Sequence, residues 1–122
     1  DVAVAKAWDD EFGGLCYSID LDGAVCNGDK IFWVQCESIG TAAMLASTTG
    51  EEKYWAIYDK LWRYSWDKWV DHEHGSWFRR MNREHVPYFT EKTKLSLCVD
   101  PDFHMLGAYA GTLTFMKDGG VA

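Results

Sequence analysis

The feature that most constrains the fold of this chain is an internal repeat with an offset of 62 residues. The pattern Asp-x-Glu-x-Gly occurs at positions 9–13 and again at positions 71–75. Each copy follows a stretch that ends in Trp and precedes a short extended segment, a polar turn and a second extended segment. Self-similarity at a fixed period is typical of repeat architectures, in which one unit needs neighbours to bury its apolar surface. We therefore expect stacked units that belong to a larger body.

Two of the predicted helices lack a polar face. Residues 31–48 and 101–117 are almost entirely apolar or small, and a helix of this composition is expected to be buried on all sides. Asp100 is the expected N-cap of the second helix, with Pro at its first position. The chain opens, at residues 1–8, with a segment that resembles the last turns of another helix. Residues 90–99 are expected to form a loop.

The helix between these two is predicted to be amphipathic. Over residues 50–70, aromatic and aliphatic residues recur at i, i+3, i+4 and i+7 with charged residues between them, which predicts an outer helix with one buried face. Thr49 and Glu52 match a capping box, with Thr at the N-cap and Glu at N3. The Trp residues of this helix are most simply interpreted as core.

A β-hairpin is expected after each copy of the repeated pattern. Asp22-Gly23 is a strong signal for a hairpin turn. The turn at residues 82–84 is a weaker signal, and Pro87 suits an edge position. The repeating unit is then an inner helix, an outer helix and a hairpin. The alternative is a small α+β domain with the apolar helices in its middle.

The composition excludes several classes of protein. The formal net charge is −7, whereas nucleic-acid binding depends on clustered cations, so no nucleic-acid partner is expected. No run of about 18 apolar residues is present, so no membrane span is expected. The four Cys residues match no metal-binding spacing, and no signal peptide is seen. We interpret them as reduced thiols of a cytoplasmic protein.

Three residues are candidates for a functional site. Glu37 is the only charged residue between Lys30 and Glu51, and a buried carboxylate is costly unless it is paired. Trp33 lies one turn earlier on the same face. His104 lies in the first turn of the last helix, where the helix dipole favours a neutral imidazole. In a ring of parallel inner helices these N-terminal ends converge, although structural roles for Glu37 and His104 remain open.

His72 and His74 could bind a metal, because they flank Glu73 at a spacing that suits a strand. No Cys or carboxylate cluster completes such a site, and the first copy of the repeated pattern has no His. We therefore interpret both as solvated turn residues and predict no metal.

Four segments resemble the N-acylglucosamine 2-epimerase and aldose–ketose isomerase superfamily, which includes mannose isomerases. Residues 30–37 are similar to the pattern K-x-x-W-V-Q-x-E, residues 71–78 to D-x-E-x-G-x-W-F and residues 101–104 to P-D-x-H. Residues 13–23 are similar to the family's Gly-Gly-aromatic segment that ends in D-x-D-G. The match departs at residues 95–99, where the family carries a Lys-Gly or Lys-Pro stretch.

The resemblance implies an all-α fold with short β-hairpins, as part of an (α/α)6 barrel of six helical hairpins. Residues 1–122 would be the C-terminal part of one catalytic barrel domain and hold roughly its last two to three hairpins. The rest of the domain would lie outside this chain.

The resemblance also implies sugar chemistry without a cofactor, either 2-epimerisation of an N-acylglucosamine or N-acylmannosamine, or mannose–fructose isomerisation. His104 would move the C2 proton of an open-chain aldose, with an enediolate as intermediate. Glu37 would be an active-site carboxylate that binds sugar hydroxyls or orients a His. Trp33 would form a pocket wall and Lys30 would contact the substrate. The second catalytic His would lie on an earlier helix, outside this chain.

Two other classes remain open. One is a non-catalytic carbohydrate-binding or interaction module, since aromatic residues can stack on sugar without chemistry. The other is a glycan-active enzyme on a related scaffold, which would need a second carboxylate beside Glu37. Because the two apolar helices cannot be enclosed by two repeats, we expect this piece alone to be inactive and to associate with the missing repeats or with a second copy.

Overall fold

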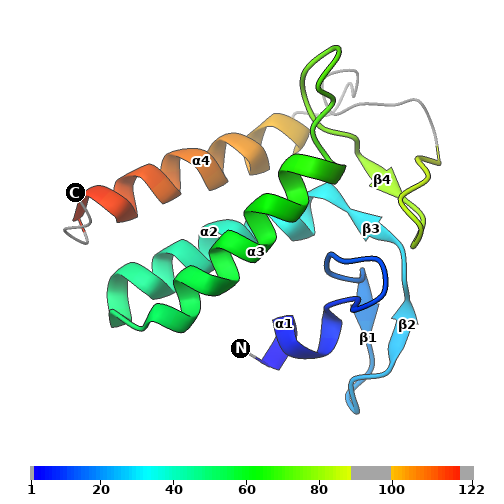
Figure 1. Cartoon of the computed structure of the whole chain (residues 1–122), viewed down its shortest axis with the longest axis horizontal. Coiled ribbons are helices and arrows are strands. Elements are labelled where there is room, and N and C mark those ends of the chain that lie inside the picture. Colours follow the sequence, from blue (N-terminus) through cyan, green and yellow to red (C-terminus); the bar gives the residue numbers. More distant parts are fainter. Residues whose placement is uncertain (1, 89–99, 119–122) are drawn as a thin grey trace.

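The computed structural model describes residues 2–88 and 100–118, and the side chains of residues 100–103 and 118 lie outside that description. The chain is mostly helical with two small antiparallel sheets (Figure 1). The elements in chain order are α1 (Val2–Ala7), β1 (Ser18–Ile19), β2 (Val25–Asn27), β3 (Lys30–Ile31), α2 (Phe32–Thr49), α3 (Glu52–Lys68), β4 (Arg80–Met81) and α4 (Asp100–Asp118). The three long helices match the predicted ones to within about two residues at each end. The loop predicted at 90–99 and the N-cap side chain of Asp100 lie outside the description.

The helix α2 lies at the centre of the arrangement and packs against both α3 and α4. Figure 1 shows α2 and α4 running in the same direction and α3 running back beside them. The helices α2 and α4 are close at Gly40, where a methyl group would make an ordinary van der Waals contact, 3.7 Å from the Cα of Ala108. At the other end of the pair, Ser47 Oγ donates to the carbonyl of Phe115 at 2.8 Å. The parallel packing brings the N-terminal ends of α2 and α4 together.

The two apolar helices are only partly enclosed in this chain, as expected for two repeats without further neighbours. One face of α2 is in the core, but Trp33 is 40% and Met44 41% exposed. On α4, Leu106 is 63% and Leu113 59% exposed. The described elements cover one side of each helix, so the remaining apolar side faces solvent in this chain.

The predicted capping box of α3 is wrong. Gly50 adopts a left-handed φ of 71° and donates its N–H to the carbonyl of Ala46, which ends α2 after Thr49. Thr49 is therefore the last residue of α2, and its hydroxyl donates to the carbonyl of Leu45 at 2.7 Å. The N-cap of α3 is Glu51, which makes no side-chain capping bond. The C-cap at Gly50 therefore determines where α2 ends and where α3 can begin.

The two copies of the Asp-x-Glu-x-Gly pattern form the same loop. Asp9 Oδ1 accepts the backbone N–H groups two and three residues further on, at 3.1 and 3.2 Å. Asp71 Oδ1 accepts the equivalent pair, both at 3.0 Å. Gly13 and Gly75 each donate their N–H to the carbonyl of that Asp at 2.7 Å, with φ of 79° and 74°. The two copies of the sequence pattern thus make the same set of hydrogen bonds.

The sheets connect the two units. The first hairpin forms as predicted, with β1 antiparallel to β2 around the turn that contains Gly23. In the second hairpin, Met81 and Pro87 form only an isolated bridge. The main partner of β4 is β3, in the register Lys30 with Met81 and Ile31 with Arg80. The strand that follows the second repeat loop is therefore paired with the strand that leads from the first hairpin into α2.

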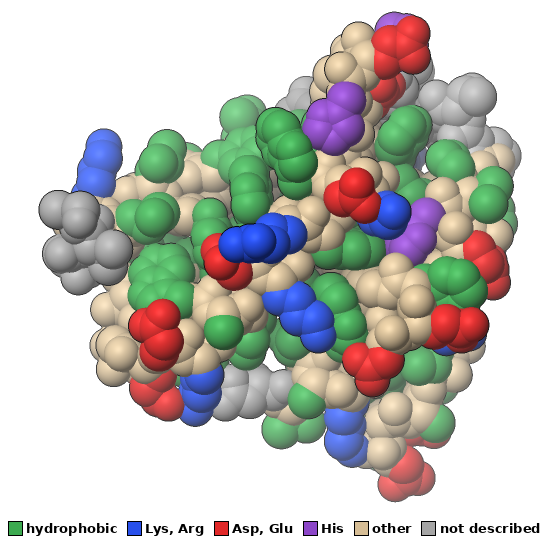
Figure 2. Space-filling model, viewed as in Figure 1, with side chains coloured by type: hydrophobic (Ala, Val, Ile, Leu, Met, Phe, Trp, Pro, Cys, Tyr) green, Lys and Arg blue, Asp and Glu red, His purple; other side chains and the backbone are tan. Residues whose placement is uncertain are grey.

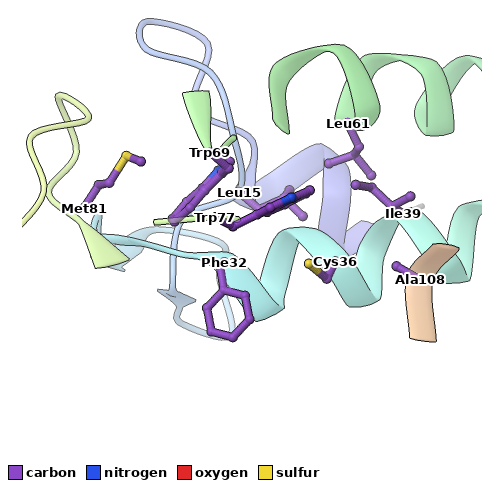
Figure 3. Packing of buried hydrophobic residues seen from close by; sticks show 9 residues of the cluster. All are labelled: Leu15, Phe32, Cys36, Ile39, Leu61, Trp69, Trp77, Met81 and Ala108. Atoms are coloured by element: carbon purple, nitrogen blue, oxygen red, sulfur yellow. The ribbon is translucent and has the colours of Figure 1, made fainter. Parts of the chain in front are cut away.

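The core lies where the repeat loops meet α2, α3 and α4 (Figure 3). Its buried members are Leu15, Phe32, Cys36, Ile39, Leu61, Trp69, Trp77, Met81 and Ala108. Only part of the aromatic stripe of α3 belongs to this core. Tyr58 and Trp62 are partly buried and pack against this core, whereas Trp66, which stacks on Trp62, is 53% exposed. Figure 2 shows hydrophobic side chains gathered on this side, between α3 and α4.

Among the residues described, no helix is long and apolar enough to cross a membrane.

Candidate functional site

Glu37 and His104 come together at the N-terminal ends of α2 and α4. The distance between His104 Nδ1 and Glu37 Oε1 is 2.5 Å, although the two residues are 67 positions apart in the sequence. The His104 side chain is 21% exposed and that of Glu37 is 55% exposed, so solvent reaches both. The expectation that these two residues share one end of parallel inner helices is confirmed, while their roles in catalysis remain predictions.

Aromatic rings enclose His104 on two sides. Phe32 meets the imidazole edge-on with a centroid distance of 6.0 Å. Trp33 lies 6.1 Å from it at an angle of 34°. Phe32 is buried, whereas Trp33 faces solvent beside the His. Trp33 thus lies beside the imidazole, and its role as a pocket wall stays a prediction. Phe32 is a second aromatic contact of the imidazole that was not predicted from the sequence.

The contact between His104 and Glu37 determines what the imidazole can do chemically. A carboxylate only accepts hydrogen bonds, so Nδ1 carries the proton in this pair. The lone pair of the neutral ring is then on Nε2, which can take up a proton from a bound molecule. The carboxylate also stabilises the imidazolium that results from such a transfer. This arrangement suits a general acid–base group that is oriented by a fixed partner.

Lys30 does not reach this site. Its ammonium group is fully buried and donates to Asp9 Oδ2 at 2.9 Å and to the carbonyl of Gly14 at 3.4 Å. Arg83 contacts the same carboxylate at 2.8 and 3.0 Å. Burial by itself raises the pKa of Asp9, but the hydrogen bonds from Arg83 and Lys30 outweigh it and hold that pKa well below its usual range. Lys30 is therefore an internal ion-pair partner, and we no longer place it among the substrate-binding residues.

The other His residues lie in the two turns of the second unit. His72 is exposed, and its Nε2 contacts the carbonyl of Trp66 at 2.8 Å. His74 lies 3.4 Å from Asp71. His85 is partly buried, with its Nε2 2.9 Å from the hydroxyl of Tyr64. Residues 2–88 and 104–117 contain no group of three potential metal ligands.

Two residues near the site were not predicted from the sequence. Gln35 is fully buried, accepts the N–H of Leu15 at 3.1 Å and donates to its carbonyl at 3.0 Å. It thereby attaches the repeat loop to α2 just before Glu37. Tyr17 packs against Trp33 from the same loop. A polar residue within the apolar helix was a signal for Gln35, whereas Tyr17 gave no signal.

The chain belongs to the N-acylglucosamine 2-epimerase family, whose model matches residues 1–107. A D-mannose isomerase of Marinomonas mediterranea is 40% identical over 108 residues, which are 88% of this chain and 27% of that protein. An N-acylglucosamine 2-epimerase of Bos taurus is 33% identical over 65% of this chain and 20% of its own length. A crystal structure of a D-mannose isomerase superposes with a TM-score of 0.87 at 39% identity, covering 93% of this chain and 28% of the other.

The chain thus spans about a quarter of the length of the relatives it matches. Structures of this kind are (α/α)6 barrels, and this chain corresponds to only a part of one.

Proposed function

We propose that the protein containing this chain interconverts sugars at C2 of an open-chain aldose, with mannose–fructose isomerisation as the favoured reaction. The observation that carries the proposal is the 2.5 Å contact between His104 and Glu37 at the shared end of α2 and α4. Similarity to D-mannose isomerases supports the choice of substrate. Epimerisation of an N-acylglucosamine at C2 is the second candidate, supported by similarity to an N-acylglucosamine 2-epimerase.

In this proposal His104 Nε2 moves a proton and Glu37 holds the imidazole. The base removes the proton from C2 of the open-chain aldose, and the electron pair forms an enediolate with the carbonyl carbon. Return of the proton to C1, with transfer of the O2 hydroxyl proton to O1, gives the ketose, whereas return of the proton to the other face of C2 gives the epimer. A second acid–base residue is needed outside this chain for epimerisation. Positioned acid–base groups contribute roughly 10²–10⁴-fold each.

Trp33 supplies the apolar surface in this reaction. Its ring is exposed beside the imidazole, and the C–H face of a sugar stacks on such a surface. Glu37 is also half exposed, so its second oxygen can accept a sugar hydroxyl. Trp33 and Glu37 would bind and orient the sugar, while His104 performs the proton transfer without a cofactor.

The same proposal extends to the whole domain. We infer that this chain is the C-terminal part of one (α/α)6 barrel and that the missing repeats cover the exposed faces of α2 and α4. Met44 and Leu113, which face solvent here, support this inference. Apolar patches of this kind are uncommon on the surface of soluble monomers. A cytoplasmic location and a homodimer are part of the same hypothesis.

The experiment uses the full-length protein with D-mannose in heavy water. We expect fructose that carries deuterium at C1, and glucose with deuterium at C2 would indicate epimerisation instead. His104→Gln should lower kcat by about 10²–10⁴-fold without lowering the melting temperature. His72→Gln, which changes an exposed turn His, should leave kcat unchanged. Sugar binding without any deuterium incorporation would refute the proposal and favour a non-catalytic carbohydrate-binding module.

A further inference from the structure

The ring of Tyr17 is perpendicular to the ring of Trp33, the exposed aromatic residue of the proposed sugar site. Its ring meets Trp33 with a centroid distance of 6.4 Å and an interplanar angle of 88°. Trp33 in turn is tilted by only 34° from the ring of His104. Tyr17 is 45% exposed, so part of its ring is open to a molecule that lies on Trp33. Because its ring is perpendicular to that of Trp33, Tyr17 does not extend the stacking surface that Trp33 offers.

A network of hydrogen bonds holds the backbone of Tyr17 in place. The N–H of Tyr17 donates to the carbonyl of Asp29 at 2.9 Å. The carboxylate of Asp29 accepts the hydroxyl of Tyr88 at 2.7 Å and the guanidinium Nε of Arg80 at 3.1 Å. Burial raises the pKa of Asp29, but these hydrogen bonds hold it below its usual range, so the carboxylate is charged at neutral pH. Asp29 thus fixes Tyr17 to both small sheets.

We propose that Tyr17 is a specificity-determining residue that limits the length of the sugar. The inference rests on the proposed function, in which C2 lies at His104 and the carbon chain extends across Trp33. The far end of the sugar's carbon chain, at C6, then approaches the ring of Tyr17. A hexose with a free O6 fits in front of the ring, whereas a second sugar attached to O6 collides with it. The site therefore selects sugars whose O6 is free.

Binding measurements test this selectivity independently of turnover. We would titrate the full-length protein with D-mannose and with α-1,6-mannobiose, in which a second mannose is attached to O6, and compare the ratio of the two Kd values. Tyr17→Ala should improve the relative affinity for mannobiose by about tenfold or more, because removing a steric barrier has effects of this order. Tyr17→Phe keeps the ring and should match the wild type. Leu21→Ala is the matched control, since Leu21 is fully exposed on the same hairpin.

Several results would overturn the proposal. One is an unchanged or lowered relative affinity for mannobiose in a Tyr17→Ala protein that melts at the wild-type temperature. Another is a Tyr17→Phe protein that behaves like Tyr17→Ala, because the hydroxyl would then be responsible instead of the ring. If Tyr17→Ala does not fold, Tyr17→Leu, which retains an apolar contact with Trp33, carries the same expectation. Failure of the wild type to turn over mannose while it binds mannose refutes only the proposed reaction, and the ratio still decides the role of Tyr17.

Discussion

Replacing Lys30 by Met separates a structural role for this residue from a role in substrate binding. Lys30 is fully buried, and its partner Asp9 has a side chain that is 1% exposed. The Met side chain has a similar length and no charge, so it fills the space without adding a polar group. Asp9 then retains Arg83 as its cationic partner, and the side chain of Arg83 is 45% exposed.

The expected loss of stability follows from this geometry. Removing one partner of a buried ion pair costs about 3–5 kcal/mol, because the other charge is left without full compensation. Arg83 and the two loop N–H groups still hold the carboxylate of Asp9. We therefore expect a value near the lower end, about 3 kcal/mol. An exposed pair is worth far less, so Arg63→Met, which removes the pair with Asp59 on α3, should cost about 0.5 kcal/mol or less.

The assay is urea-induced unfolding of the full-length protein at pH 7, combined with the KM for mannose. The structure predicts a clear decrease in the urea midpoint for Lys30→Met and a KM close to that of the wild type at temperatures where the variant is folded. An unchanged midpoint with a raised KM would refute the ion-pair argument. It would restore Lys30 as a substrate-binding residue.

Three further predictions concern the repeat loops and the thiols. The low pKa of Asp9 stabilises the fold above about pH 4 and this stabilisation is lost as the pH falls further, so the stability difference between wild type and Asp9→Asn should shrink in acid unfolding experiments. Gly14→Ala should lower the melting temperature more than Gly75→Ala, because both have positive φ but only at Gly14 would the new methyl group overlap a tyrosine ring of α3. Cys36 is buried with its pKa raised to about 12, so native-state alkylation at pH 8 followed by peptide mass spectrometry should label the exposed Cys26 and leave Cys36 unmodified.

The sequence predicted the helices well because their signals are local. The small-residue composition of 31–48 and the aromatic spacing of 50–70 both depend on residues within a few turns of one another. The capping box failed for a local reason as well. Thr49 and Glu52 match the motif, but Gly50 between them is a better helix C-cap, and the two signals compete for the same residues.

The pairing of Glu37 with His104 was predictable from position within the repeat. Both residues lie near the start of an apolar helix, and equivalent helices of stacked units run parallel. Lys30 was misplaced because the motif that contains it also contains Trp33 and Glu37, and neighbours in a motif need not face the same way. Lys30 lies in β3, where alternate side chains point to opposite sides, and its side chain points into the ion pair with Asp9.

What the sequence could not predict is the set of contacts between units. The pairing of β3 with β4 joins residues 49 and 51 positions apart, and neither two-residue strand carries a periodic signal of its own. The Asp29–Arg80 contact depends on that pairing, since Arg80 lies opposite Ile31 in the register. Tyr17 depends on Asp29 in turn. The proposed catalytic residues can therefore be identified from their positions in the helices. The residue proposed to select the sugar can be identified only from the contacts between the two units.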